Sequence, residues 1–265
     1  MATPYVRQAS GIAQTIPELQ QDLIGNLANY YPARERFYSF GKCSAVQNVL
    51  RDTWDGPTDI YVFPTVGQQM QVVSTNANDT ALGANIQQVY LRYLDSNYLE
   101  KSEVITLNGL TPVLTVATDI IRVNRLRAER IGSVGYSAGA ISLTNIGATV
   151  TYAILPATAN VSRQLLYTIP GDKVGYLNHW QASSGSTGSH FTQMSLLATC
   201  HDGVAVPGVF LLQDEQGSQN NGQVANFHIP IRLPPRTDIK VGVRSDASNA
   251  NVTALTGIMG WTEPA

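Results

Sequence analysis

The residues 135–139, GYSAG, match the G-x-S-x-G pattern in which a serine acts as the nucleophile of acyl transfer. That chemistry requires a strand that turns sharply into a helix, because this geometry lifts the hydroxyl clear of the sheet. Residues 140–147, AISLTNIG, instead show the two-residue period of a strand followed by a turn. We therefore interpret 135–139 as a glycine-rich turn and expect no catalytic residue. An esterase or glycan-active enzyme using Ser137 is kept as the enzymatic alternative.

The other side chains that could bind a metal or a cofactor show no ligand spacing. The histidines do not form H-x-H or H-x-x-x-H pairs, and the acidic residues do not form a D-x-D-x-D loop. Cys43 and Cys200 lie far apart and form no C-x-x-C pair, so we expect two buried thiols. We predict no metal, no cofactor and no disulfide. The histidines are His179, His190, His201 and His228.

Several of the chain's thirteen arginines lie close together in the sequence. Four lie within nine residues: Arg122, Arg125, Arg127 and Arg130. On a strand, Arg125 and Arg127 share one face and the other two share the opposite face, which argues against a single phosphate-binding patch. One alternative is ion pairing with Asp119, Glu129 or carboxylates across a sheet. The other is a protein interface anchored by Arg125 and Arg127, since arginine is enriched at interfaces.

A second candidate interface lies near the N-terminus. Residues 15–18, TIPE, form a capping box with proline in the first turn, and they predict a short helix that ends before Pro32. Leu19, Leu23 and Leu27 fall on one face of that helix. We expect either an arm that docks on a partner or a helix that caps its own β-domain.

The rest of the chain predicts an all-β protein. Residues 86–126 alternate with a period of two and are interrupted by turn residues at 95–97 (DSN) and 108–109 (NG). Similar short runs continue to the C-terminus, about fifteen strands with turns every eight to twelve residues, which is typical of sandwiches and barrels. We predict two tandem antiparallel β-sandwich, jelly-roll-like domains with an N-terminal arm. The predicted parts are 1–58 (arm, helix and linker strands), 59–157 (first sandwich) and 158–265 (second sandwich).

Composition narrows the classes of partner. The formal net charge of the 265-residue chain is −2, and only 14% of its residues are charged. Nothing global attracts it to nucleic acid or to an anionic membrane, and no apolar run has the ~18–20 residues of a membrane span. We expect no nucleic acid and no membrane as partners. A polar surface with few charges is typical of a protein whose surface is largely in contact with other protein molecules.

The chain resembles virion structural proteins of tailed bacteriophages. The resemblance lies mainly in 59–178, and its most specific pieces are TLNGLTPV at 106–113 and YTIPGDKVGY at 167–176. It implies a non-enzymatic virion protein, assembled in the bacterial host cytoplasm, and it carries over no functional residue. We favour a capsid decoration or cement protein that forms a homo-oligomer, a trimer in preference, and binds the major capsid protein. The alternative is a tail or baseplate adaptor or receptor-binding protein, with recognition loops at 182–189 or 214–222.

Overall fold

Burial alternates along several strands with the two-residue period of a β-strand. In β3 (Met70–Ser74), Met70, Val72 and Ser74 are buried while the residues between them are partly exposed. The computed structural model describes residues 34–186, 188, 190–199, 208–246 and 252–265. These residues contain strands and turns with no helix, so the all-β prediction is confirmed for this part of the chain. The predicted helix, with Leu19, Leu23 and Leu27, lies outside the described residues.

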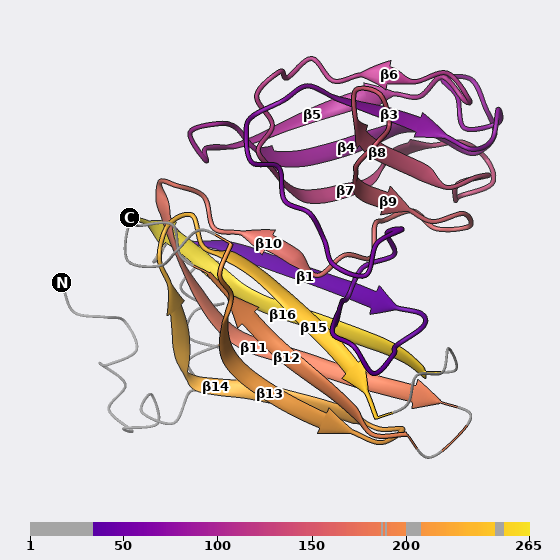
Figure 1. Cartoon of the computed structure of the whole chain (residues 1–265). Helices are drawn as coiled ribbons and strands as arrows, with labels where there is room; N and C mark the ends of the chain where they lie inside the picture. Colours follow the sequence, from indigo (N-terminus) through magenta and orange to yellow (C-terminus); the bar gives the residue numbers. More distant parts are fainter. Residues whose placement is uncertain (1–33, 187, 189, 200–207, 247–251) are drawn as a thin grey trace, which may run out of the picture.

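The other strands follow in chain order and are shown in Figure 1. They are β1 (Glu35–Cys43), β2 (Arg51–Asp52), β4 (Ile86–Leu94), β5 (Glu100–Thr106), β6 (Val113–Leu114), β7 (Arg122–Ile131), β8 (Ile141–Asn145), β9 (Thr151–Leu155), β10 (Leu166–Thr168), β11 (Lys173–Ser186), β12 (Thr192–Ala198), β13 (Leu211–Ser218), β14 (Gly222–Leu233), β15 (Asp238–Ser245) and β16 (Val252–Pro264).

The prediction of two tandem β-sandwich domains is wrong. The described strands form four small sheets, with the orders β1-β16-β11-β14, β10-β15-β12-β13, β6-β3-β8-β9 and β5-β4-β7, and β2 adds to β15. The first sheet places β1 beside β16, with Glu35 opposite Thr262 and Cys43 opposite Ala254. The spacing of turns predicts how long the strands are, but it does not predict which strands pair. The β1–β16 pair joins segments that are far apart in the chain. The limits at 58/59 and 157/158 stay a prediction.

Two hydrophobic cores hold the sheets together. The first core draws on β3 to β9 and includes Met70, Leu91 and Leu143, all with no exposed surface. The second core draws on β1, β10 to β12, β15 and β16 and includes Trp180 and Val241. In Figure 1, β3 to β9 form the upper part of the molecule, and β10 and β1 lie on the side of the lower part that faces it.

The predicted turns are found where the sequence placed them. Gly109 adopts a φ of 59°, a left-handed conformation that favours glycine, and the N–H of Thr111 donates to the Asn108 carbonyl at 3.0 Å. Asp95 accepts hydrogen bonds from the backbone N–H groups of Asn97 and Leu99. Both turns depend on local chemistry, which a sequence displays directly.

Candidate interface at the Arg125 junction

The arginine-rich strand β7 contains a bulge that breaks its simple alternation. The register with β4 shifts between Arg92 and Tyr93, so Arg92 lies opposite Arg125 while Tyr93 lies opposite Val123. A bulge places an extra residue in one strand and redirects the side chains beyond it. Val123 is consequently buried in the first core, whereas Arg125 and Arg127 are partly exposed.

Arg122 is buried and joins two sheets. Its Nε and Nη2 donate to the two carboxylate oxygens of Asp238, at 2.8 and 3.0 Å, and its Nη1 donates to the carbonyl of Pro64 at 2.8 Å. The guanidinium also lies 4.9 Å from the Phe63 ring centre and 5.4 Å from that of Tyr98. The expected ion pairing of this arginine is therefore found, but with a carboxylate on β15.

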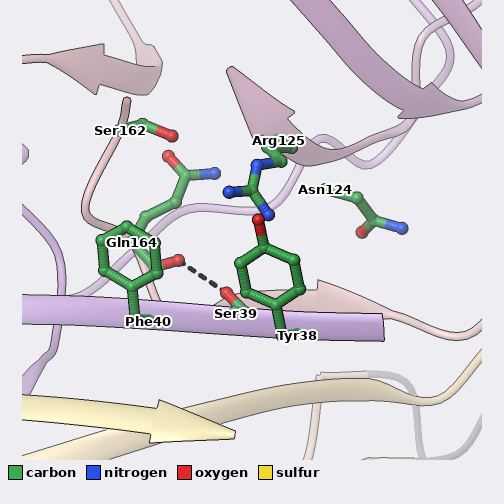
Figure 2. Close-up of a pocket in the computed structure, with 7 residues that line it drawn as sticks. All are labelled: Tyr38, Ser39, Phe40, Asn124, Arg125, Ser162 and Gln164. Atoms are coloured by element: carbon green, nitrogen blue, oxygen red, sulfur yellow. Dashed lines mark hydrogen bonds between the residues drawn. The ribbon is translucent and has the colours of Figure 1, made fainter. Parts of the chain in front are cut away.

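Arg125 lies at a junction where three segments meet. Its guanidinium stands 4.2 Å from the ring centre of Tyr38 on β1, and its Nε is buried without a hydrogen-bond partner. Gln164 closes the other side, and its backbone carbonyl accepts a hydrogen bond from the Ser39 hydroxyl at 2.9 Å (Figure 2). The cavity between them has a volume of about 10 Å³. We call this set of lining residues the junction: Tyr38, Ser39, Phe40, Asn124, Arg125, Ser162 and Gln164.

The size and polarity of the junction define what it can hold. Gln164 is 4% exposed, and its Oε1 has no hydrogen-bond partner, while its Nε2 donates to the Val123 carbonyl at 3.4 Å. A cavity of this volume admits one water molecule, and a water needs polar partners such as an N–H donor and a carbonyl acceptor. The junction is therefore suited to joining β1, β7 and the 162–164 segment, and it is too small for an organic substrate.

Arg127 lies on the exposed side of β7. Its Nη1 is 2.8 Å from the Glu129 carboxylate, with both side chains more than a third exposed, and its guanidinium lies 4.5 Å from the Tyr90 ring centre. The expected pairing with Glu129 is found. An exposed ion pair of this kind contributes about 0–1 kcal/mol. The role of Arg125 and Arg127 in an interface with another protein stays a prediction.

The serine of the GYSAG stretch is buried in a turn before β8. The Ser137 hydroxyl donates to the Pro156 carbonyl at 2.7 Å, and the residue has no exposed surface. The carboxylate of Asp79 accepts the backbone N–H groups of Ala138 and Gly139, each at 3.0 Å. These hydrogen bonds give the turn a structural explanation.

The described part of the chain contains no cluster of three or more His, Cys, Asp or Glu side chains that could hold a metal ion. His179 is hydrogen-bonded to Asn226 at 2.7 Å, and His190 lies 3.4 Å from Asp246. Cys43 is a buried free thiol, and burial raises its pKa. Cys200 and His201 lie outside the described residues. Where residues are described, no helix has the length and apolar character needed to cross a bilayer.

Comparisons with known proteins give no family. No family model and no curated protein matches the chain. Solved structures with weak similarity include that of infectious bursal disease virus Gt strain (11% identity, 88% of this chain and 73% of that chain, TM-score 0.25). Others are the N-terminal tandem CBM22 domains of Paenibacillus barcinonensis Xyn10C (8%, 87% and 93%, 0.25) and a mutant VP2 protein of infectious bursal disease virus (11%, 87% and 73%, 0.22). A viral capsid protein and carbohydrate-binding modules thus stand among them, but such low TM-scores support no argument about fold or function.

Proposed function

We propose that the chain is a non-enzymatic structural protein of a tailed-bacteriophage virion, and that it decorates the capsid by binding and stabilising the shell. The observation that carries this proposal is a pair of apolar edge strands. Among the described strands, β13 and β14 each end a sheet and have a partner on one side only. They expose Leu211, Leu212 and Ile229, and Ile229 is 87% exposed.

Unpaired edges with apolar side chains favour contact with other protein. An exposed strand edge offers free N–H and C=O groups that another chain can pair with. Here β13 carries two adjacent exposed leucines, Leu211 and Leu212, at its start. Contacts with the major capsid protein or with further copies of this chain, in a trimer by preference, would cover these groups.

A tail or baseplate role is the second candidate, with 182–189 or 214–222 as its expected recognition loops. In the structure, 182–186 belongs to β11 and 214–218 to β13, so these residues pair in sheets. Copy number separates the two roles. Quantitative mass spectrometry of purified particles is expected to find hundreds of copies per particle, and a few dozen or fewer would contradict the decoration role.

Binding of the purified protein to undecorated particles tests which surface is used. Leu212→Lys and Ile229→Lys place charges on the two edge strands, and we expect each to weaken binding by more than tenfold. Leu82→Lys is the matched control, because Leu82 is 96% exposed and lies in a turn away from both edges. Equal binding by all variants would contradict the proposal.

The enzymatic alternative has its own test. Generic ester and glycan substrates are offered to the wild-type protein and to Ser137→Ala. We expect no hydrolysis by either protein, since the hydroxyl is buried and donates to the Pro156 carbonyl. Hydrolysis that disappears in Ser137→Ala would overturn the structural role.

A further inference from the structure

The sheet β1-β16-β11-β14 has an outer face that points away from the second core. Along β1, the residues Phe37, Ser39, Gly41 and Cys43 are buried, and the alternate residues point outward. The register places one outward-pointing residue of each strand in a row across the sheet. In the order of the strands, the row is Phe40, Gly257, Gln181 and Val224, and its glycine has no side chain.

A groove of about 390 Å³ lies on this face. Phe40, Gln181, Val224 and Leu255 contribute side chains to its walls. Gly257 stands between Phe40 and Gln181, and the Gln181 side chain lies against it. Val224 and Leu255 are 58% and 51% exposed. Exposed apolar side chains grouped around a concave surface indicate a site that another segment covers.

The described chain begins at the end of the same face. The guanidinium of Arg34 lies 5.0 Å from the ring centre of Trp261, and the Trp261 ring stacks on Tyr176 at 5.5 Å. Trp261 and Tyr176 lie opposite each other on β16 and β11 and point outward, like the walls of the groove. The residues that precede Arg34 are therefore attached at one end of the outer face.

We propose that residues 15–31 of the same chain dock on this groove, with Leu19, Leu23 and Leu27 covering Phe40, Val224 and Leu255. The rows of Trp261 and Leu255 are six residues apart, about 20 Å along the strands. Residues 15–31 span about 25 Å even at the ~1.5 Å rise of the most compact regular form, so they reach across the face.

Charge and connection favour this occupant over a second copy. The segment carries Glu18 and Asp22 and no basic residue, whereas the outward residues of β1 include Arg36 and Lys42. Only residues 32–34 link the segment to β1, and such a short link gives a high effective concentration at the groove. The inference does not depend on the virion role.

Photo-crosslinking of the full-length protein tests this docking. A photoreactive phenylalanine derivative replaces Leu255, and the same replacement at Val116, which is 86% exposed on the connection between β6 and β7, is the control. After irradiation and tryptic digestion, we expect the Leu255 probe to be joined to the peptide 8–34 in protein of monomeric mass. The Val116 probe is expected to give at least tenfold less of that product.

A second pair of variants shows whether the leucines mediate the contact. Replacing Leu19, Leu23 and Leu27 by serine is expected to lower the crosslink yield at least tenfold. Replacing the polar neighbours Gln20, Gln21 and Asn26 by serine is expected to preserve the yield. The proposal is overturned if the crosslink to 8–34 is absent from the Leu255 probe, or if it occurs only in protein of dimeric mass, which would assign the groove to a second copy.

Discussion

Arg122 shows how one buried charge can hold two sheets in place. Burial lowers the pKa of a guanidinium, but the hydrogen bonds and the charge of Asp238 outweigh this, so that the pKa of Arg122 lies above its ordinary value. Asp238 also accepts the Thr168 hydroxyl at 2.6 Å, which ties β10 to the same pair. A buried pair of this kind adds little net stability, yet it is costly to break because the remaining charge is left uncompensated.

The substitution Arg122→Met tests this role. We expect it to lower the free energy of unfolding by about 3–5 kcal/mol, because Asp238 would lose its counter-charge in a buried site. Arg127→Met, on the exposed side of the same strand, is the matched control and is expected to cost about 0–1 kcal/mol. Denaturant unfolding measures both. The double variant Arg122→Met with Asp238→Leu is expected to recover part of the loss, and an equal effect of the two single substitutions would refute the assignment.

At the scale of single residues, the sequence shows which residues can form ion pairs, but it does not show which partner each residue pairs with. The pairing of Arg127 with Glu129 was predictable because the two residues are close in the chain. Arg122 finds Asp238 after 116 residues, and the contacts of Arg125 with Tyr38 and of Ser39 with Gln164 also join distant segments. None of these contacts follows from composition or spacing.

The turn between β4 and β5 is organised by one carboxylate. Asp95 accepts the backbone N–H groups of Asn97 and Leu99 at 2.8 and 2.9 Å, and Lys101 lies 2.8 Å away. Burial alone would raise the pKa of Asp95, but these hydrogen bonds outweigh it and hold the pKa below its ordinary value. The ionised form therefore stabilises the folded state more than the protonated form does.

Asp95→Asn is expected to lower the free energy of unfolding by about 1–2 kcal/mol at pH 7, since a neutral amide accepts the same N–H groups less strongly. The lowered pKa makes the contribution of Asp95 complete above the unfolded pKa of about 3.9, and it is lost as the pH falls through the lower folded value. The difference between wild type and variant should thus shrink below about pH 4. Unfolding curves between pH 2.5 and 7 measure it, with Asp172→Asn at an exposed aspartate as control. A constant difference across this range would contradict the prediction.

Strands and turns were predictable because their signals are local. The period of two, the Asn108-Gly109 turn and the Asp95 turn all depend on residues within a few positions of one another. The bulge in β7 has no such signal, and it changes which arginines and apolar residues are buried. Pairing of strands into four sheets also lies beyond the local pattern.

At the scale of the whole molecule, the main feature of the fold is the pairing of the first described strand with the last. β16 lies between β1 and β11, so the last strand completes a sheet that contains the first. Phe37 and Cys43 of β1 belong to the second core together with residues of β16. The sequence does not show this pairing of the first and last strands, because contacts that close a long stretch of chain leave no mark on the sequence between them.

Two deletions that differ only by β1 distinguish this arrangement from a self-sufficient 158–265 domain. Removing residues 1–33 is expected to keep cooperative unfolding, because β1 remains paired with β16.

Removing residues 1–43 takes away the whole β1–β16 pairing together with Phe37 and Cys43, which are 2% and 4% exposed. The loss of a buried phenylalanine alone costs about 3–5 kcal/mol, and a typical domain has only about 5–15 kcal/mol of stability. We therefore expect the second core of the shorter protein to unfold, with loss of the near-ultraviolet circular dichroism of buried Trp180. Equal stability of the two deletion variants would show that 158–265 folds without β1.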